Sequence, residues 1–89
     1  MLTKIRIFGS PLCENCKELC KRLTEDGLEY TWLDADAEEH EDLCDQYEVE
    51  YLPHIQILYR NKVVFNHVGP IESDVLKVIF NRLKNKYCR

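Results

Sequence analysis

The spacing of apolar residues divides the first third of the chain into a strand and a helix. The segment TKIRIF, from Thr3 to Phe8, alternates apolar and polar positions, which predicts a strand ending at Gly9. The spacing then changes to that of an amphipathic helix, and Gly27 stands where a helix C-terminus favours a left-handed residue. We therefore predict a helix from about Cys13 to Asp26, with an apolar stripe formed by Cys16, Leu19, Cys20 and Leu23.

The middle of the chain predicts a second strand and a short acidic helix. LEYTWLD, from Leu28 to Asp34, is rich in aromatic residues and is typical of a strand. Asp36 followed by Glu39 resembles a capping box at a helix start. The helix that follows would take its apolar side from Leu43, Cys44 and Tyr47.

The last third of the chain predicts a hairpin and a closing helix. PHIQILY and VVFNHV are strand patterns separated by Arg60-Asn61-Lys62, a tight turn in which Asn tolerates a positive φ. After the hairpin, apolar residues recur at helical spacing for about four turns. The residues that mark this helix are Ile71, Val75, Val78, Ile79, Leu83 and Tyr87.

The resulting order is β-α-β-α-β-β-α, which restricts the topology. Two strands joined through a helix should lie parallel with a right-handed crossover, whereas a hairpin adds antiparallel strands. We therefore expect a single α/β domain over residues 1–89, with a four-stranded mixed sheet flanked by three helices on its two faces.

Composition and charge narrow the classes of function. The chain has no apolar run long enough for a membrane span and no signal-peptide pattern, so we expect a cytoplasmic protein that does not bind membranes. Residues 1–50 carry 14 acidic against 5 basic side chains, which argues against nucleic-acid binding. The basic residues near the C-terminus are typical of a solvated helix face. We expect a monomer.

Three of the five cysteines lie in SPLCENCKELC, and the first two have the spacing of a redox pair. Cys13 opens the predicted helix, where free N–H groups and the helix dipole stabilise a thiolate, so we predict a lowered pKa and a nucleophilic role. Cys16, three residues later, could attack a mixed disulfide at Cys13 and resolve it. Glu14 opposes thiolate formation and Lys17 favours it, so their balance stays open.

With these motifs in view, the chain resembles the thioredoxin/glutaredoxin superfamily over nearly all of its length. The strand followed by SPLCENC is similar to the opening of small glutaredoxin-like thioredoxins. YEVEYLPHIQILYRNK is similar to the family's cis-proline stretch, and HVGPIESDVLKVIFNRL to the glycine that precedes the last helix. The resemblance implies a thioredoxin-like fold in which Leu52-Pro53 is cis and faces the cysteines, so that the Leu52 backbone could pair with an extended substrate.

The resemblance also implies a function and a set of site residues. It implies a thiol-disulfide oxidoreductase that reduces protein disulfides through catalytic Cys13 and Cys16, with no bound cofactor and no metal. The substrate would lie in a groove formed by Leu12, Tyr51, Leu52, Pro53 and Gly69.

The electron donor is left open by the departures from both branches of the superfamily. Glutathione-using glutaredoxins carry a Lys near Ser10 and a Gly-Gly where this chain has VGPIESD. Thioredoxins place Trp before the first cysteine and Gly-Pro inside the pair, where this chain has Leu12 and Glu14-Asn15. Reducing equivalents could therefore come from NADPH through a thioredoxin reductase, or from glutathione in a glutaredoxin-like reaction.

The remaining cysteines and histidines leave weaker alternatives. Cys13, Cys16 and Cys20 could begin a metal or iron–sulfur site that Cys44 completes, although metal sites usually join two close cysteine pairs. We expect Cys20 and Cys44 to be helix-core residues. Cys88 is expected to be exposed, and Trp32 to lie in the core or on the sheet surface. Among the histidines, only His54 is placed to affect the cysteines, because it follows Pro53. A redox-silent interaction domain is a further alternative.

Overall fold

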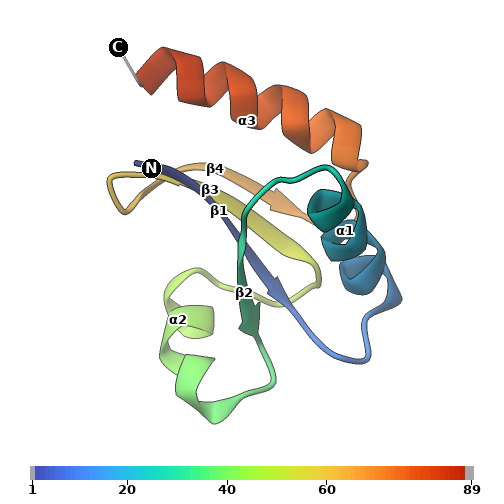
Figure 1. Cartoon of the computed structure of the whole chain (residues 1–89). Helices are drawn as coiled ribbons and strands as arrows, with labels where there is room; N and C mark the ends of the chain where they lie inside the picture. Colours follow the sequence, from blue (N-terminus) through green and yellow to red (C-terminus); the bar gives the residue numbers. More distant parts are fainter. Residues whose placement is uncertain (1, 88–89) are drawn as a thin grey trace.

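The computed structural model describes residues 2–87 and contains four strands and four helical segments. The expected order is confirmed, with one short 3₁₀ helix added before the acidic helix (Figure 1). The elements are β1 (Thr3–Gly9), α1 (Glu14–Glu25), β2 (Thr31–Asp34), η1 (Glu38–His40), α2 (Glu41–Gln46), β3 (His54–Tyr59), β4 (Lys62–Val68) and α3 (Ser73–Tyr87).

The four strands form one mixed sheet in the order β2-β1-β3-β4. β1 and β2 are parallel, with Gly9 paired to Asp34, whereas β1–β3 and β3–β4 are antiparallel. This confirms the predicted four-stranded mixed sheet. The pairing brings the C-terminal ends of β1 and β2, the start of β3 and the end of β4 to one end of the sheet.

Local backbone preferences account for the turn and the helix end that were predicted. Arg60 and Asn61 both have positive φ, 50° and 68°, so the hairpin has a two-residue turn that matches the strand twist. Lys62, predicted within the turn, instead begins β4 and pairs with Tyr59. Gly27 has φ 74° immediately after the C-cap of α1. The second strand is shorter than predicted, because residues 28–30 do not join the sheet ladder.

One face of the sheet is covered by α1 and α3, and this face holds the main core. Alternate residues of β1 and β3 contact Leu19 and Leu23 of α1, as the helical stripe predicted. The prediction for α3 was partly wrong: Val75 and Val78 are about half exposed, and the helix instead buries Leu76 and Phe80. The core residues are Ile5, Ile7, Leu19, Leu23, Ile55, Ile57, Leu76 and Phe80.

The opposite face of the sheet carries a polar network around the buried side chains of Gln56 and His54. Arg6 Nε donates to Gln56 Oε1 at 2.9 Å, and Gln56 Nε2 donates to Asn66 Oδ1 at 3.1 Å. His54 Nε2 lies 2.9 Å from the same Asn66 oxygen. The Arg6 guanidinium also lies 5.0 Å from the ring centre of Tyr47, the C-cap of α2. Gln56, which is fully buried on this face, thus has partners for both of its amide atoms, as burial requires.

The capping box predicted at the acidic segment is not formed. The N-cap of η1 is Ala37 without a side-chain hydrogen bond, and Asp36 is instead bonded to Ser10. Tertiary contact therefore replaces a local cap. None of the helices described between residues 2 and 87 is long and apolar enough to cross a membrane.

Candidate active site

The cysteine pair lies where the chain leaves the end of β1 and enters α1. Cys13 is the N-cap of α1 in an extended conformation, and its sulfur accepts a hydrogen bond from the Cys16 N–H at 3.2 Å. Cys16 lies one turn inside the helix and is fully buried, whereas Cys13 is half-buried. A disulfide joins the two residues, with their Cα atoms 5.2 Å apart. The two sulfurs are therefore unequal in accessibility.

Ser10 organises the loop that presents the pair. Its side chain is buried, its hydroxyl donates to Asp36 Oδ2 at 2.7 Å, and it accepts from the Leu12 N–H at 3.2 Å. The Ser10 carbonyl also accepts from the Cys13 N–H at 3.0 Å. The sequence reasoning missed this role, because the Asp36 partner is 26 residues away and no local pattern indicates it.

Trp32 packs where Gly9 has no side chain. A Cβ placed on Gly9 would overlap the Trp32 ring, 2.6 Å from Cζ3, and would lie 3.1 Å from Cys16 Sγ. The indole thus fills the space beside the end of β1, close to the buried sulfur of the pair. Trp32, predicted only as a core or sheet-surface residue, is therefore part of the wall behind the disulfide.

The residues expected to form a substrate groove come from three separate loops. The Leu52-Pro53 bond is cis, as the resemblance implied. Pro53 is buried and its carbonyl accepts from the Gly69 N–H at 2.8 Å, which joins the loop after β4 to the start of β3. Leu12 is 89% exposed and Tyr51 is 69% exposed. At Leu52, neither backbone group forms a hydrogen bond with residues 2–87.

The charges beside the cysteines partly offset one another. Lys17 Nζ lies 3.6 Å from a Glu14 carboxylate oxygen, and both side chains are mostly exposed. The two residues whose influences on Cys13 were predicted to oppose each other therefore form an ion pair, which is weak because water screens it.

His54 does not contact the cysteine pair. Because side chains alternate along a strand and Ile55 faces α1, His54 faces the opposite side of the sheet. Its ring packs edge-on against Phe8, and its buried Nδ1 atom has no hydrogen-bond partner among residues 2–87. The geometry therefore gives no support to the idea that His54 affects the cysteines directly.

The other cysteines are separate from the redox pair. Cys20 packs against the main core, and burial raises the pKa of its thiol while a hydrogen bond with Tyr30 lowers it. Burial also raises the pKa of Cys44, and the nearby Asp45 and Asp36 carboxylates add to this effect. Cys88 lies outside the described residues. Between residues 2 and 87, no three His, Cys, Asp or Glu side chains are grouped as metal ligands.

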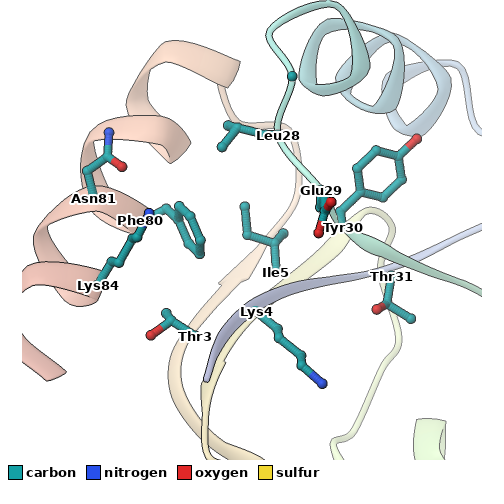
Figure 2. A pocket seen from close by; sticks show the side chains of 11 residues that line it. Thr3, Lys4, Ile5, Leu28, Glu29, Tyr30, Thr31, Phe80, Asn81 and Lys84 are labelled. Carbon is teal, nitrogen blue, oxygen red and sulfur yellow. The ribbon is translucent and has the colours of Figure 1, made fainter. Parts of the chain in front are cut away.

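A hollow of about 490 Å³ lies away from the disulfide, at the other end of β1. Figure 2 shows Ile5, Leu28 and Phe80 pointing toward one another there, with Lys84 on the α3 side. Neither Cys13 nor Cys16 lines it. The hollow and the disulfide are therefore separate features of the molecule.

Comparisons with known proteins agree with this geometry. No curated protein sequence matches the chain. Among solved structures, thioredoxin f2 from Chlamydomonas reinhardtii matches with a TM-score of 0.78 and 15% identity, covering 93% of this chain and 80% of that one. The germline-specific thioredoxin Deadhead from Drosophila melanogaster matches with a TM-score of 0.72 and 21% identity, covering 91% and 80%. Thioredoxin O2 from Arabidopsis thaliana in the oxidized state matches with a TM-score of 0.71 and 17% identity, covering 92% of this chain and 75% of that one.

The structural matches establish the fold, and the sequence match establishes the family. The fold together with the Cys13–Cys16 disulfide supports thiol-disulfide oxidoreductase activity in general terms. The family model described as Thioredoxin matches residues 5–82, so the chain belongs to the thioredoxin family.

Proposed function

We propose that the protein reduces disulfide bonds in other proteins through the Cys13/Cys16 dithiol. The observation that carries this proposal is the difference between the two residues: Cys13 is the partly exposed N-cap of α1, and Cys16 is buried one turn inside the helix. A substrate can therefore reach one sulfur and not the other. The free N–H groups at the helix start stabilise a negative charge on Cys13.

The reaction follows from this arrangement in two exchanges. In the reduced protein, the Cys13 thiolate attacks one sulfur of a substrate disulfide, the substrate S–S bond breaks, and the departing sulfur takes up a proton. Cys16 then loses its proton and attacks Cys13 Sγ, which releases the second substrate thiol and closes the 13–16 disulfide. The substrate gains two electrons and two protons, and the protein is left oxidised.

The free backbone of Leu52 supports an extended substrate. A peptide strand could pair with its N–H and C=O groups, as occurs when a chain adds to an exposed backbone edge. Leu12, next to Cys13, and Tyr51, next to Leu52, present exposed apolar surface, and Gly69 lacks a side chain that would obstruct the approach. We assign the substrate groove to Leu12, Tyr51, Leu52, Pro53 and Gly69.

A separate donor must return two electrons to the disulfide. We propose that a flavoprotein of the thioredoxin-reductase type supplies them from NADPH in the cytoplasm, because Ser10 and Pro70 stand where a glutathione-using relative has its lysine and second glycine. The test supplies oxidised protein either with NADPH and a thioredoxin reductase, or with NADPH, glutathione and glutathione reductase. Turnover in the first system is expected. Turnover in the second alone would identify a glutathione-coupled enzyme.

Two variants test whether the cysteines carry the reaction. Cys13→Ser should abolish disulfide reduction, because no nucleophile remains at the exposed position. Cys16→Ser should still attack once and then accumulate a mixed disulfide at Cys13, which mass spectrometry of the intact protein detects. Cys20→Ser is the matched control on the same helix and should retain turnover. Wild-type turnover in both Cys13→Ser and Cys16→Ser would refute the proposed function.

A further inference from the structure

The disulfide end of the molecule carries a concentrated negative charge. Residues 34–50, which connect β2 to the loop before β3, contain nine carboxylates and no Lys or Arg. Eight of these acids are exposed. We call this stretch the acidic connection; its acids are Asp34, Asp36, Glu38, Glu39, Glu41, Asp42, Asp45, Glu48 and Glu50.

The acidic connection is attached to both loops that flank the disulfide. It begins beside the loop before Cys13, where the Ala35 N–H donates to the Gly9 carbonyl at 2.8 Å and Asp36 accepts from Ser10. It ends at Glu50, immediately before Tyr51 and the cis-proline loop. In Figure 1 the acidic connection, with α2 in it, lies at the same end of the sheet as the loop from β1 into α1.

These carboxylates are not neutralised within the described chain. The ion pairs among residues 2–87 involve Glu14, Glu18, Asp26 and Asp74, and none includes an acid of the acidic connection. The negative potential at the disulfide end therefore acts on any molecule that approaches the sulfurs.

The opposite end of the sheet carries an excess of positive charge. The Arg60 N–H donates to the Leu2 carbonyl at 3.1 Å, which places the hairpin turn beside the start of β1. Stacking of Tyr59 on Tyr87, with ring centres 4.7 Å apart, brings the end of α3 to the same place. The basic residues there are Lys4 and Lys84 beside the hollow, Arg60 and Lys62 in the hairpin, Lys86 beside Tyr87, and Lys77, which pairs with Asp26. The acids of that end are Glu29 beside the hollow and Glu25 and Asp26 at the end of α1.

From this separation of charge we infer that the protein selects disulfides flanked by Lys or Arg side chains, and that the exposed apolar surface at Leu12 and Tyr51 is the docking site for such cationic segments. The inference rests on the proposed function and names its substrate class. Oriented charge of this kind steers a partner during diffusion, so that a cationic partner meets the disulfide end and an anionic one meets the other end.

The two exposed side chains fit the same partner. Tyr51 is 69% exposed and adjoins Glu50, so its ring can contact an Arg or Lys side chain whose charge the carboxylate balances. Leu12, 89% exposed, immediately precedes Cys13 and offers apolar contact beside it. Affinity then comes from apolar contact and backbone pairing, while the negative charge of the acidic connection raises the association rate of cationic partners.

The experiment uses three disulfide-linked peptide dimers that differ only in charge. Each strand has the sequence X-Gly-Cys-Gly-X with blocked ends, and X is Lys, Ser or Glu. The second-order rate of oxidation of the reduced protein is followed by intact mass after acid quenching. Each rate is divided by that of dithiothreitol with the same peptide, because flanking charge alters the intrinsic reactivity of a disulfide.

At low ionic strength we expect the corrected rate for the Lys peptide to exceed that for the Glu peptide by about tenfold or more. The ratio should fall toward one at about 0.5 M salt, where the screening length is only a few ångströms. The double variant Glu48→Lys/Glu50→Lys should lower the low-salt ratio by at least about threefold. The control Glu25→Lys/Glu29→Lys makes the same change in net charge at the other end and should leave the ratio within about twofold.

Each result bears on the inference. A corrected ratio near one at low salt, or equal effects of the two double variants, would overturn it while leaving the disulfide-reductase function in place. Absence of reaction with all three peptides, when dithiothreitol reduces them, would overturn both. A Ser peptide that reacts at a rate between those of the other two would support steering by charge.

Discussion

The contact between Gly9 and Trp32 allows a specific test of how the disulfide is supported. In Gly9→Ala, the added methyl would lie 2.6 Å from Trp32 Cζ3 and 3.1 Å from Cys16 Sγ, so the indole must shift. Forcing a methyl into a filled site costs about 1–3 kcal/mol, and the lower entropy of alanine in the unfolded chain returns about 0.4–1 kcal/mol. We expect a net loss of about 1–2 kcal/mol in the free energy of unfolding.

Urea denaturation followed by circular dichroism measures this loss. For a chain of this size, each 1 kcal/mol corresponds to a fall of about 4–8 °C in Tm. Since Trp32 is the chain's single tryptophan, its emission should also change in Gly9→Ala. In a Trp32→Ala background, the cost of Gly9→Ala should decrease by at least about 1 kcal/mol, because the overlapping ring is absent. Equal costs in the two backgrounds, with unchanged emission in Gly9→Ala, would refute the argument.

Three further substitutions test other contacts. Asn66→Ala removes the acceptor shared by His54 and Gln56 and should lower the free energy of unfolding, measured by urea denaturation, by about 1 kcal/mol. The loss is limited because position 66 is exposed, so water can take the place of the lost acceptor. Ser10→Ala should lower stability by about 1 kcal/mol and reduce kcat/KM for disulfide reduction; unchanged values of both would contradict the role of the loop. Because folding raises the pKa of Cys20, the stability it contributes is present below about pH 9, the ordinary range of a thiol, and is lost as pH rises through the folded pKa. The free energy of unfolding of the wild type should therefore fall more between pH 8 and 10 than that of Cys20→Ala. The Cys20 thiol should also react more slowly with iodoacetamide in the folded protein than in the unfolded protein.

Predictions based on local pattern were confirmed wherever neighbouring residues decide the outcome. The redox spacing of Cys13 and Cys16, the left-handed Gly27 and the Arg60-Asn61 turn each depend on a few consecutive residues. The cis bond at Pro53 was predicted from the family resemblance alone, because without such a resemblance an X-Pro bond is expected to be trans.

Predictions failed where the packing surface had to be known. In α3, Val75 and Val78 fit a helical apolar stripe, yet the sheet lies against Leu76 and Phe80. Periodicity alone does not specify which of two overlapping stripes faces a neighbour when apolar residues occur on both. Asp36 similarly matched a capping pattern, but its carboxylate accepts the Ser10 hydroxyl instead.

The sequence by itself determined the element order, the positions of the main turns and the placement of a cysteine pair at a helix start. These properties follow from interactions over a few residues, which periodicity and backbone preference record. Only the tertiary structure decided that Trp32 fills the space over Gly9 and that the acidic connection gathers at the disulfide end. The physical reason is that strand pairing joins segments that are distant in sequence, and the resulting burial and electric field depend on all of them together.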